Sequence, residues 1–157
     1  QGLPDGEYRA HMLFRAIPDA KPVESGAGRK DGVSIALTPI YGVTIPIIVR
    51  QGSLAASAAI ANPRILREKE GPALAFTLSR SGSRSVYGQI RITKPGIAKP
   101  VFEVRGIAVY AEIPERTVKL AIPEDMVAVL TGPVKIEYVE DNEAGGGTMA
   151  SLDAAIR

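Results

Sequence analysis

The stretch Ala73-Leu-Ala-Phe-Thr-Leu-Ser79 and the later stretch Val86-Tyr-Gly-Gln-Ile-Arg-Ile-Thr93 decide the fold class of this chain. In the first, and in the second half of the other, apolar side chains recur at every second residue, which is the period of a β-strand with one buried face. Between them lies Ser81-Gly82-Ser83, a typical turn sequence. The two stretches therefore predict short β-strands separated by a turn.

The same pattern of short apolar segments and turn signals continues from residue 53 to the C-terminus. Strands are expected at about 53–61, 73–79, 86–93, 101–111, 116–122, 133–139 and 148–156. Asn62-Pro63 is one of the turn signals between them, and residues 123–126 favour a single helical turn. Seven short strands in about 105 residues are typical of an immunoglobulin-like β-sandwich. Its expected core consists of Leu74, Phe76, Leu78, Ile90, Ile92, Ile107 and Val109.

Two further strands are expected before residue 53. Residues 7–17 alternate between apolar or small side chains at even positions and mostly polar ones at odd positions. Residues 33–50 form the longest regular segment, which as one strand would run on the order of 55 Å, beyond the usual strand length. Pro39, Gly42 and Pro46 cannot all lie in a central ladder, so we expect a bend, a bulge or an edge position.

The composition of the chain excludes several classes of protein. Its 157 residues are 45% hydrophobic and 23% charged, as in globular proteins. The absence of cysteine excludes disulfide scaffolds, cysteine-ligated metal sites and thiol catalysis, and His11 as the single histidine excludes sites with two imidazole ligands. A net charge of +2 with 5% aromatic residues does not favour nucleic-acid binding. No segment reaches the roughly 18 apolar residues of a membrane span.

No motif predicts catalysis. His11 lies on the polar side of an expected strand without an acidic partner at a catalytic spacing, which is typical of a surface histidine. The glycine-rich residues 26–32 lead into a strand, whereas a phosphate-binding loop leads into a helix. The acidic residues 140–143 lack the alternating ligand spacing of calcium loops, so an acidic turn is the preferred interpretation. We expect no enzyme activity, metal or cofactor.

Tyr8 is the most specific local signal. Immunoglobulin-like domains carry a tyrosine near the start of their F strand, two residues before a cysteine. Tyr8 follows Gly6 and precedes Ala10, which stands at the position of that cysteine. The alternative interpretation is that Tyr8 caps an ordinary hairpin.

A resemblance to a known family covers nearly the whole chain. The segment Gly6-Glu-Tyr-Arg-Ala-His-Met-Leu-Phe-Arg-Ala-Ile-Pro18, with residues 33–37 and 45–50, resembles the F and G strands of the first domain of periplasmic pilus-assembly chaperones. The segments Arg80-Ser-Gly-Ser-Arg-Ser-Val-Tyr-Gly88 and Arg105-Gly-Ile-Ala-Val-Tyr110 resemble their second domain. The resemblance implies an all-β chain with a partial N-terminal immunoglobulin-like domain, 1–52, and a C-terminal one, 53–157.

The resemblance also implies a function. Such chaperones work in the periplasm of Gram-negative bacteria, where they stabilise pilin-type subunits by lending a G strand to the subunit's incomplete immunoglobulin-like fold. Their partners are those subunits and an outer-membrane usher. The donor residues would be Val33, Ile35 and Leu37, or in another register Ile40, Tyr41 and Val43. The family's carboxylate anchors cannot be carried over, because the first strand is missing and Pro46 stands where a lysine would be expected.

Three further expectations follow from the sequence. The alternative function is that of an extracellular structural or adhesive immunoglobulin-like module. The start at Gln1-Gly2-Leu3-Pro4-Asp5 suggests a mature or trimmed piece that lacks the earlier strands of its first domain. A hairpin without those strands exposes an apolar face, so we expect a homo-oligomer through residues 7–17 and 33–50.

Overall fold

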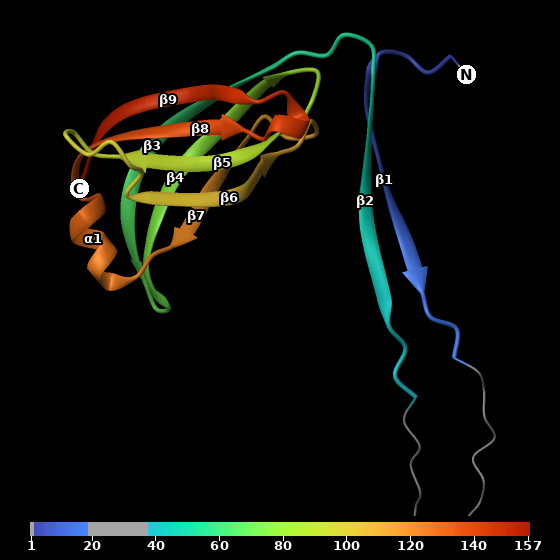
Figure 1. Cartoon of the computed structure of the whole chain (residues 1–157), viewed down its shortest axis with the longest axis horizontal. Coiled ribbons are helices and arrows are strands. Elements are labelled where there is room, and N and C mark those ends of the chain that lie inside the picture. Colours follow the sequence, from blue (N-terminus) through green and yellow to red (C-terminus); the bar gives the residue numbers. More distant parts are fainter. Residues whose placement is uncertain (1, 19–37) are drawn as a thin grey trace, which may run out of the picture. The chain divides into compact units, whose positions relative to one another are not determined.

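The computed structural model describes residues 2–18 and 38–157 and contains two compact units. The larger unit comprises Gln1–Glu7 and Arg50–Arg157, and the smaller comprises Tyr8–Val49. Strands β1 (Gly6–Arg15) and β2 (Gly42–Gln51) pair side by side in a two-stranded sheet, which we call the hairpin (Figure 1). Most of the hairpin forms the smaller unit, and its open ends belong to the larger one.

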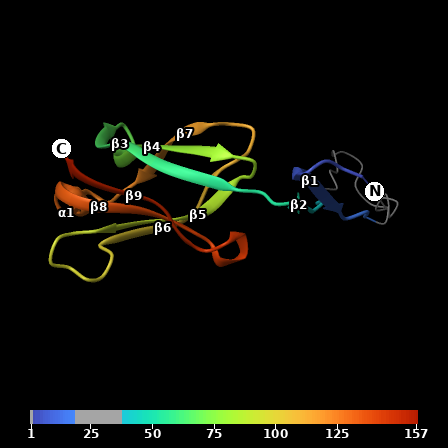
Figure 2. The same ribbon diagram turned by 90° about the horizontal axis from the view of Figure 1, so that it is seen from above.

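The larger unit is a sandwich of two antiparallel sheets (Figures 1 and 2). Its strands are β3 (Ala56–Glu68), β4 (Gly71–Gly82), β5 (Val86–Thr93), β6 (Phe102–Val109), β7 (Glu115–Ala121), β8 (Gly132–Glu140) and β9 (Gly147–Ile156). One sheet has the order β3-β4-β7 and the other the order β6-β5-β8-β9. The expected all-β fold class is therefore confirmed, while its immunoglobulin-like type stays a prediction.

The core between the two sheets contains the expected residues. Leu74, Phe76, Leu78, Ile90, Ile92, Ile107 and Val109 are all buried, in one cluster. Tyr138 from β8 adds the largest fully buried side chain, and its hydroxyl donates to the carbonyl oxygen of Ile107 at 2.8 Å. Burial raises the pKa of Tyr138 well above its usual range. The phenol therefore stays neutral and keeps its hydrogen bond to the neighbouring strand.

One local prediction in the sandwich was wrong. Asn62-Pro63 does not end a strand but lies inside β3, where the register with β4 shifts between Ala61 and Arg64 and Asn62 has a φ of 54°. A bulge on an edge strand accommodates both residues, because asparagine tolerates the left-handed region and proline has no ladder N–H to lose.

The helical element is longer than a single turn. Helix α1 spans Glu124–Leu130, and fully buried Leu130 anchors its last turn in the core. A short 3₁₀ helix, Asn142–Ala144, follows β8. Neither helix in this described part of the chain has the length and apolarity needed to cross a membrane.

Truncation of the core phenylalanine tests the strand phase. Phe76→Ala should lower the free energy of unfolding by about 3–5 kcal/mol, because it leaves a cavity between the two sheets. Ile97→Ala, at a side chain that is 49% exposed, is the matched control and should cost less than about 0.5 kcal/mol. Chemical denaturation measures both values. Equal costs for the two variants would mean that Phe76 is not in the core.

Candidate functional site

The backbone pairing of the hairpin determines which side chains share a face. The N–H of Ala16 donates to the carbonyl oxygen of Tyr41 at 2.9 Å, and Glu7 contacts Arg50 at the other end. Both contacts fit a single antiparallel register, in which directly opposed residues point to the same side. Even-numbered residues of β1 therefore share a face with odd-numbered residues of β2.

One face of the hairpin is apolar along its whole length. This apolar face consists of Tyr8, Ala10, Met12 and Phe14 from β1 and Val43, Ile45, Ile47 and Val49 from β2. Met12, Phe14 and Val43 are 46%, 53% and 60% exposed. Full burial of such a side chain contributes about 1.5–3 kcal/mol. The apolar face is therefore a surface that gains stability when a second apolar surface covers it.

The outer edge of β2 is interrupted at Pro46. In the same register, the backbone groups of Thr44, Pro46 and Ile48 point away from β1. Proline has no N–H, so Pro46 removes one donor from the outer edge and none from the ladder between the two strands. A strand added to β2 finds main-chain partners on each side of Pro46, with a gap at the proline itself.

The predicted donor residues fall into two groups. Outside the described residues lie Val33, Ile35 and Leu37. Ile40 and Tyr41 precede β2, and Val43 is its second residue; Tyr41 is 75% exposed. The regular segment 33–50 is not one strand through Ile40 and Tyr41, because β2 begins only at Gly42, and an interruption near Pro39 or Gly42 is one of the expected alternatives. Pro39 accounts for the late start, since it lacks a ladder N–H and has a fixed φ.

A buried polar network holds the open ends of the hairpin within the larger unit. The Glu7 carboxylate, whose side chain is 2% exposed, accepts hydrogen bonds from the Ser85 N–H (2.9 Å), the Ser85 hydroxyl and Arg50 Nε (3.1 Å). The Ser85 hydroxyl oxygen in turn accepts the N–H of Ala111 at 2.9 Å. Ser85 therefore connects the start of β1, the end of β2 and the segment after β6.

The charge state of Glu7 follows from these contacts. Burial alone would raise the pKa of the Glu7 carboxyl, but the hydrogen bonds from Ser85 and Arg50 outweigh it and hold the pKa below its ordinary value of 4.5. A carboxyl group with a depressed folded-state pKa stabilises the fold above its unfolded-state pKa. This stabilisation is lost as the pH falls through the folded-state value.

Two further arginines fix the turn that contains Ser85. Arg84 forms a two-point ion pair with the buried carboxylate of Glu140, with Nη2 to Oε2 at 3.0 Å. The hydrogen bond with Glu140 raises the pKa of Arg84 despite burial. Arg80 donates to the carbonyl oxygens of Gly82, Arg84 and Ala111. The turn between β4 and β5 is therefore a rigid support for Glu7.

Sequence reasoning missed this network. From the sequence, the segment around Ser85 carries part of the family resemblance and is predicted as a turn, and Glu7 is predicted at a polar position of a strand. The contacts join residues 7, 50, 85 and 111, and no local spacing relates them. The one available signal was the pair of arginines beside a turn, Arg80 and Arg84, which also fits an ordinary solvated surface.

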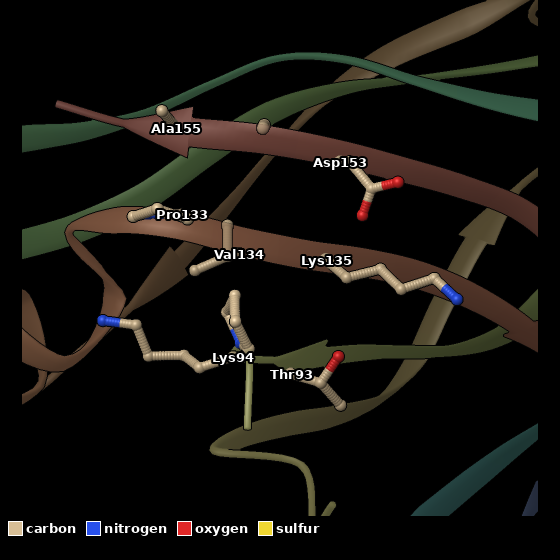
Figure 3. A pocket seen from close by; sticks show the side chains of 9 residues that line it. Thr93, Lys94, Pro133, Val134, Lys135, Asp153 and Ala155 are labelled. Carbon is tan, nitrogen blue, oxygen red and sulfur yellow. The ribbon is translucent and has the colours of Figure 1, made fainter. Parts of the chain in front are cut away.

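A groove lies on the four-stranded sheet, where β5 ends and β8 begins (Figure 3). It has the size of a ligand site but lacks converging polar groups. It has a volume of about 570 Å³ and is lined by Thr93, Lys94, Pro95, Pro133, Val134, Lys135, Asp153, Ala154 and Ala155. Lys94 and Lys135 extend in opposite directions, and each already has a partner, the Thr131 carbonyl oxygen and the Glu137 carboxylate. We therefore assign this groove no function.

The residues that could ligate a metal do not cluster in the part of the chain that the structure describes. Over residues 2–18 and 38–157, no group of three or more histidine or acidic side chains could hold a metal ion. His11 is exposed on the hairpin, and Glu140 in the acidic turn is bound by Arg84. No family model, curated protein or solved structure matches the chain.

The Glu7 network is tested by the pH dependence of stability. Glu7→Gln should lower the free energy of unfolding at neutral pH by about 1.5–3 kcal/mol, because hydrogen bonds to a charged acceptor are lost or weakened. The deficit should shrink as the pH falls below 4.5, where the wild-type carboxylate becomes protonated. Glu115→Gln, at an exposed residue of β7, is the control and should show no such deficit. A deficit that stays constant down to about pH 2 would contradict the role of the Glu7 charge.

Proposed function

We propose that this chain is a non-enzymatic periplasmic chaperone that stabilises pilin-type subunits by adding a β-strand to their incomplete immunoglobulin-like fold. The observation that carries the proposal is the exposed apolar face of the hairpin, next to the outer edge of β2. A subunit that lacks one strand presents an apolar groove between two unpaired strand edges. The hairpin offers both the side chains and the main-chain groups that such a groove lacks.

The exposure of this edge supports a binding role. A long apolar strand at the edge of a sheet promotes aggregation, and proteins commonly protect such edges with charges or short strands. β2 is ten residues long, and its charged residue is Arg50 at the end held by Glu7. Its other side chains are mostly apolar, with Thr44 and Gln51 as the polar exceptions. This composition suits a strand that is used in strand addition.

Pro46 limits where the donor segment can lie. An added strand that spanned the proline would lose a hydrogen bond at its centre, because the outer edge of β2 lacks a donor there. The favoured donor segments therefore precede Pro46. They are residues 33–37, which the family resemblance indicates, and residues 40–43, of which Tyr41 and Val43 are strongly exposed. The proposed outer-membrane usher would receive the capped subunit.

A pair of neighbouring substitutions on β2 tests strand addition. Val43→Asp places a charge on the apolar face and should abolish binding of a pilin-type subunit that lacks one strand, because the carboxylate would be desolvated in the groove. Thr44→Asp introduces the same charge on the opposite face and should retain most of the affinity. Calorimetric titration with the purified subunit measures both. Equal binding by the two variants would contradict the use of this segment.

The second donor segment has a separate test. If residues 33–37 enter the subunit, Ile35→Asp should abolish the same binding while the chain stays folded by circular dichroism. Ser34→Asp is the control at the adjacent position. Loss of binding with Val43→Asp but not with Ile35→Asp would assign the donor register to residues 40–43.

In the absence of a subunit, we propose that two copies of the chain cover each other's apolar faces. Identical faces are self-complementary about a twofold axis, which makes a symmetric pair the simplest closed assembly. Met12→Asp should convert the chain into a monomer in sedimentation velocity at micromolar concentration. Leu13→Asp changes a neighbouring exposed side chain on the opposite face and should leave the dimer intact. A monomeric wild-type chain would refute the pairing.

A further inference from the structure

The face of the hairpin opposite the apolar face is cationic. Arg9, His11 and Arg15 occupy odd positions of β1, so the register places them on this second face. A Cβ added at Gly42 would lie 3.7 Å from Cδ1 of Leu13, as expected if odd residues of β1 share a face with even residues of β2. Arg9, His11 and Arg15 are all exposed, and we call the surface that they form the cationic face.

The net positive charge of the chain resides in the unit that carries this face. The unit Tyr8–Val49 contains five of the 19 basic residues and three of the 17 acidic residues, which gives it a net charge of +2. The larger unit is left with 14 of each and has no net charge. In the described parts of the smaller unit, residues 8–18 and 38–49, no side chain is acidic. Between the Glu7–Arg50 pair and its open end, the described hairpin therefore carries positive charge only.

The hairpin is thin enough to place both of its faces in the interface of a lipid bilayer. The apolar face and the cationic face are the two sides of one two-stranded sheet (Figure 1). The hydrocarbon core of a bilayer is flanked on each side by a polar headgroup layer of roughly 5–8 Å. An apolar face seated where the acyl chains meet the headgroups would leave the cationic face at the level of the lipid phosphates. A sandwich, whose two sheets lie about 10 Å apart, would hold its outer face beyond that layer.

A tyrosine lies at each end of the apolar side of the hairpin. Tyr8 begins the apolar face, and Tyr41 continues the same side beyond Val43, because the backbone of Tyr41 pairs with Ala16. The side chain of Tyr41 is 75% exposed. Tyrosine is enriched at membrane–water interfaces, where its ring contacts apolar groups while its hydroxyl stays with water. These side chains therefore suit a segment that lies in the plane of the interface.

We propose that the hairpin binds anionic lipid surfaces, with its apolar face against the acyl chains and Arg9 and Arg15 among the lipid phosphates. A guanidinium group binds phosphate oxygens by two-point hydrogen bonds, and its long apolar stem lets it reach them along the edge of the hairpin. An acidic protein would use the cationic face alone, whereas a lipid surface uses both faces of the sheet. Lipid binding does not depend on the proposed strand addition, because it needs no unpaired strand edge. A lipid surface and a subunit would compete for the apolar face.

Co-sedimentation of the full chain with phospholipid vesicles tests the cationic face. The chain should bind vesicles made of equal parts of phosphatidylglycerol and phosphatidylcholine, and should bind pure phosphatidylcholine vesicles at least about tenfold more weakly. Arg15→Gln should weaken binding to the anionic vesicles about fivefold, the share of one arginine near a charged surface. Arg105→Gln removes the same charge from a side chain of the sandwich that is 79% exposed, and it should leave the binding unchanged.

A matched pair of isoleucines tests the apolar face. Ile45 and Ile48 are 47% and 43% exposed on β2 and lie on opposite faces of the hairpin. Ile45→Asn should weaken binding to the anionic vesicles about tenfold, because it replaces apolar area with an amide that loses its water against the acyl chains. Ile48→Asn lies on the side of the cationic face and should retain most of the affinity. Circular dichroism checks that both variants stay folded.

Three results would overturn the proposal. The first is the absence of binding to the anionic vesicles, or equal binding to the neutral ones. The second is an equal effect within either pair of variants, which would mean that the corresponding face is not used. The third is equally tight binding to soluble polyglutamate, which would assign the cationic face to acidic polypeptides instead. Arg15→Gln should leave the binding of a pilin-type subunit unchanged, so a failure of lipid binding is distinguishable from a failure of strand addition.

Discussion

A sheet of two strands cannot cover its own faces, and the behaviour of the hairpin depends on this constraint. Each strand pairs with one neighbour among the described residues, so the apolar face has no second layer there. The sandwich solves the same problem by packing two sheets against each other around Phe76 and Tyr138. The hairpin is a single sheet with no second sheet packed on it among the described residues. Its apolar side chains are therefore available for a partner.

The ends of this hairpin are held by electrostatics rather than by apolar packing. A carboxylate as buried as Glu7 is unfavourable unless donors replace its lost water. Ser85 and Arg50 provide those donors, and Arg80 and Arg84 hold the turn that presents Ser85. The arrangement is specific because each group depends on the others for its position. Removal of one partner would leave a buried polar group unpaired, which costs more than the contact itself contributes.

Much of the fold follows from the period-two pattern of apolar residues. The expected strand over 86–93 coincides with β5, and all of the expected core residues are buried. Both predictions succeed because apolar residues at every second position mark the side of a strand that faces the core. Two parts of the sequence misled this reasoning. Asn62-Pro63 predicts a turn, but a bulge keeps both residues inside β3. At Ile40 and Tyr41 the alternation of the sequence continues, but β2 has not yet begun. Composition alone cannot distinguish a bulge from a turn at such dipeptides.

The candidate sites were less predictable than the core. The apolar alternation of residues 43–49 was visible in the sequence, and so was the hairpin that carries it. The Glu7–Ser85 contact was not, since it joins residues far apart in the chain that no local spacing relates. Polar residues on a strand look alike in the sequence, whether water, a carboxylate or a cavity lies beside them.

The position of Pro46 has a consequence for self-association. Amyloid-like stacking requires an unbroken row of main-chain hydrogen bonds along every strand, repeated from copy to copy. The row on the outer edge of β2 is broken near its middle, so a growing stack of identical strands would carry the same defect in each layer. One residue thus separates two kinds of assembly. Adding a single strand costs at most one main-chain hydrogen bond at Pro46. A fibril would lose one such hydrogen bond in every layer.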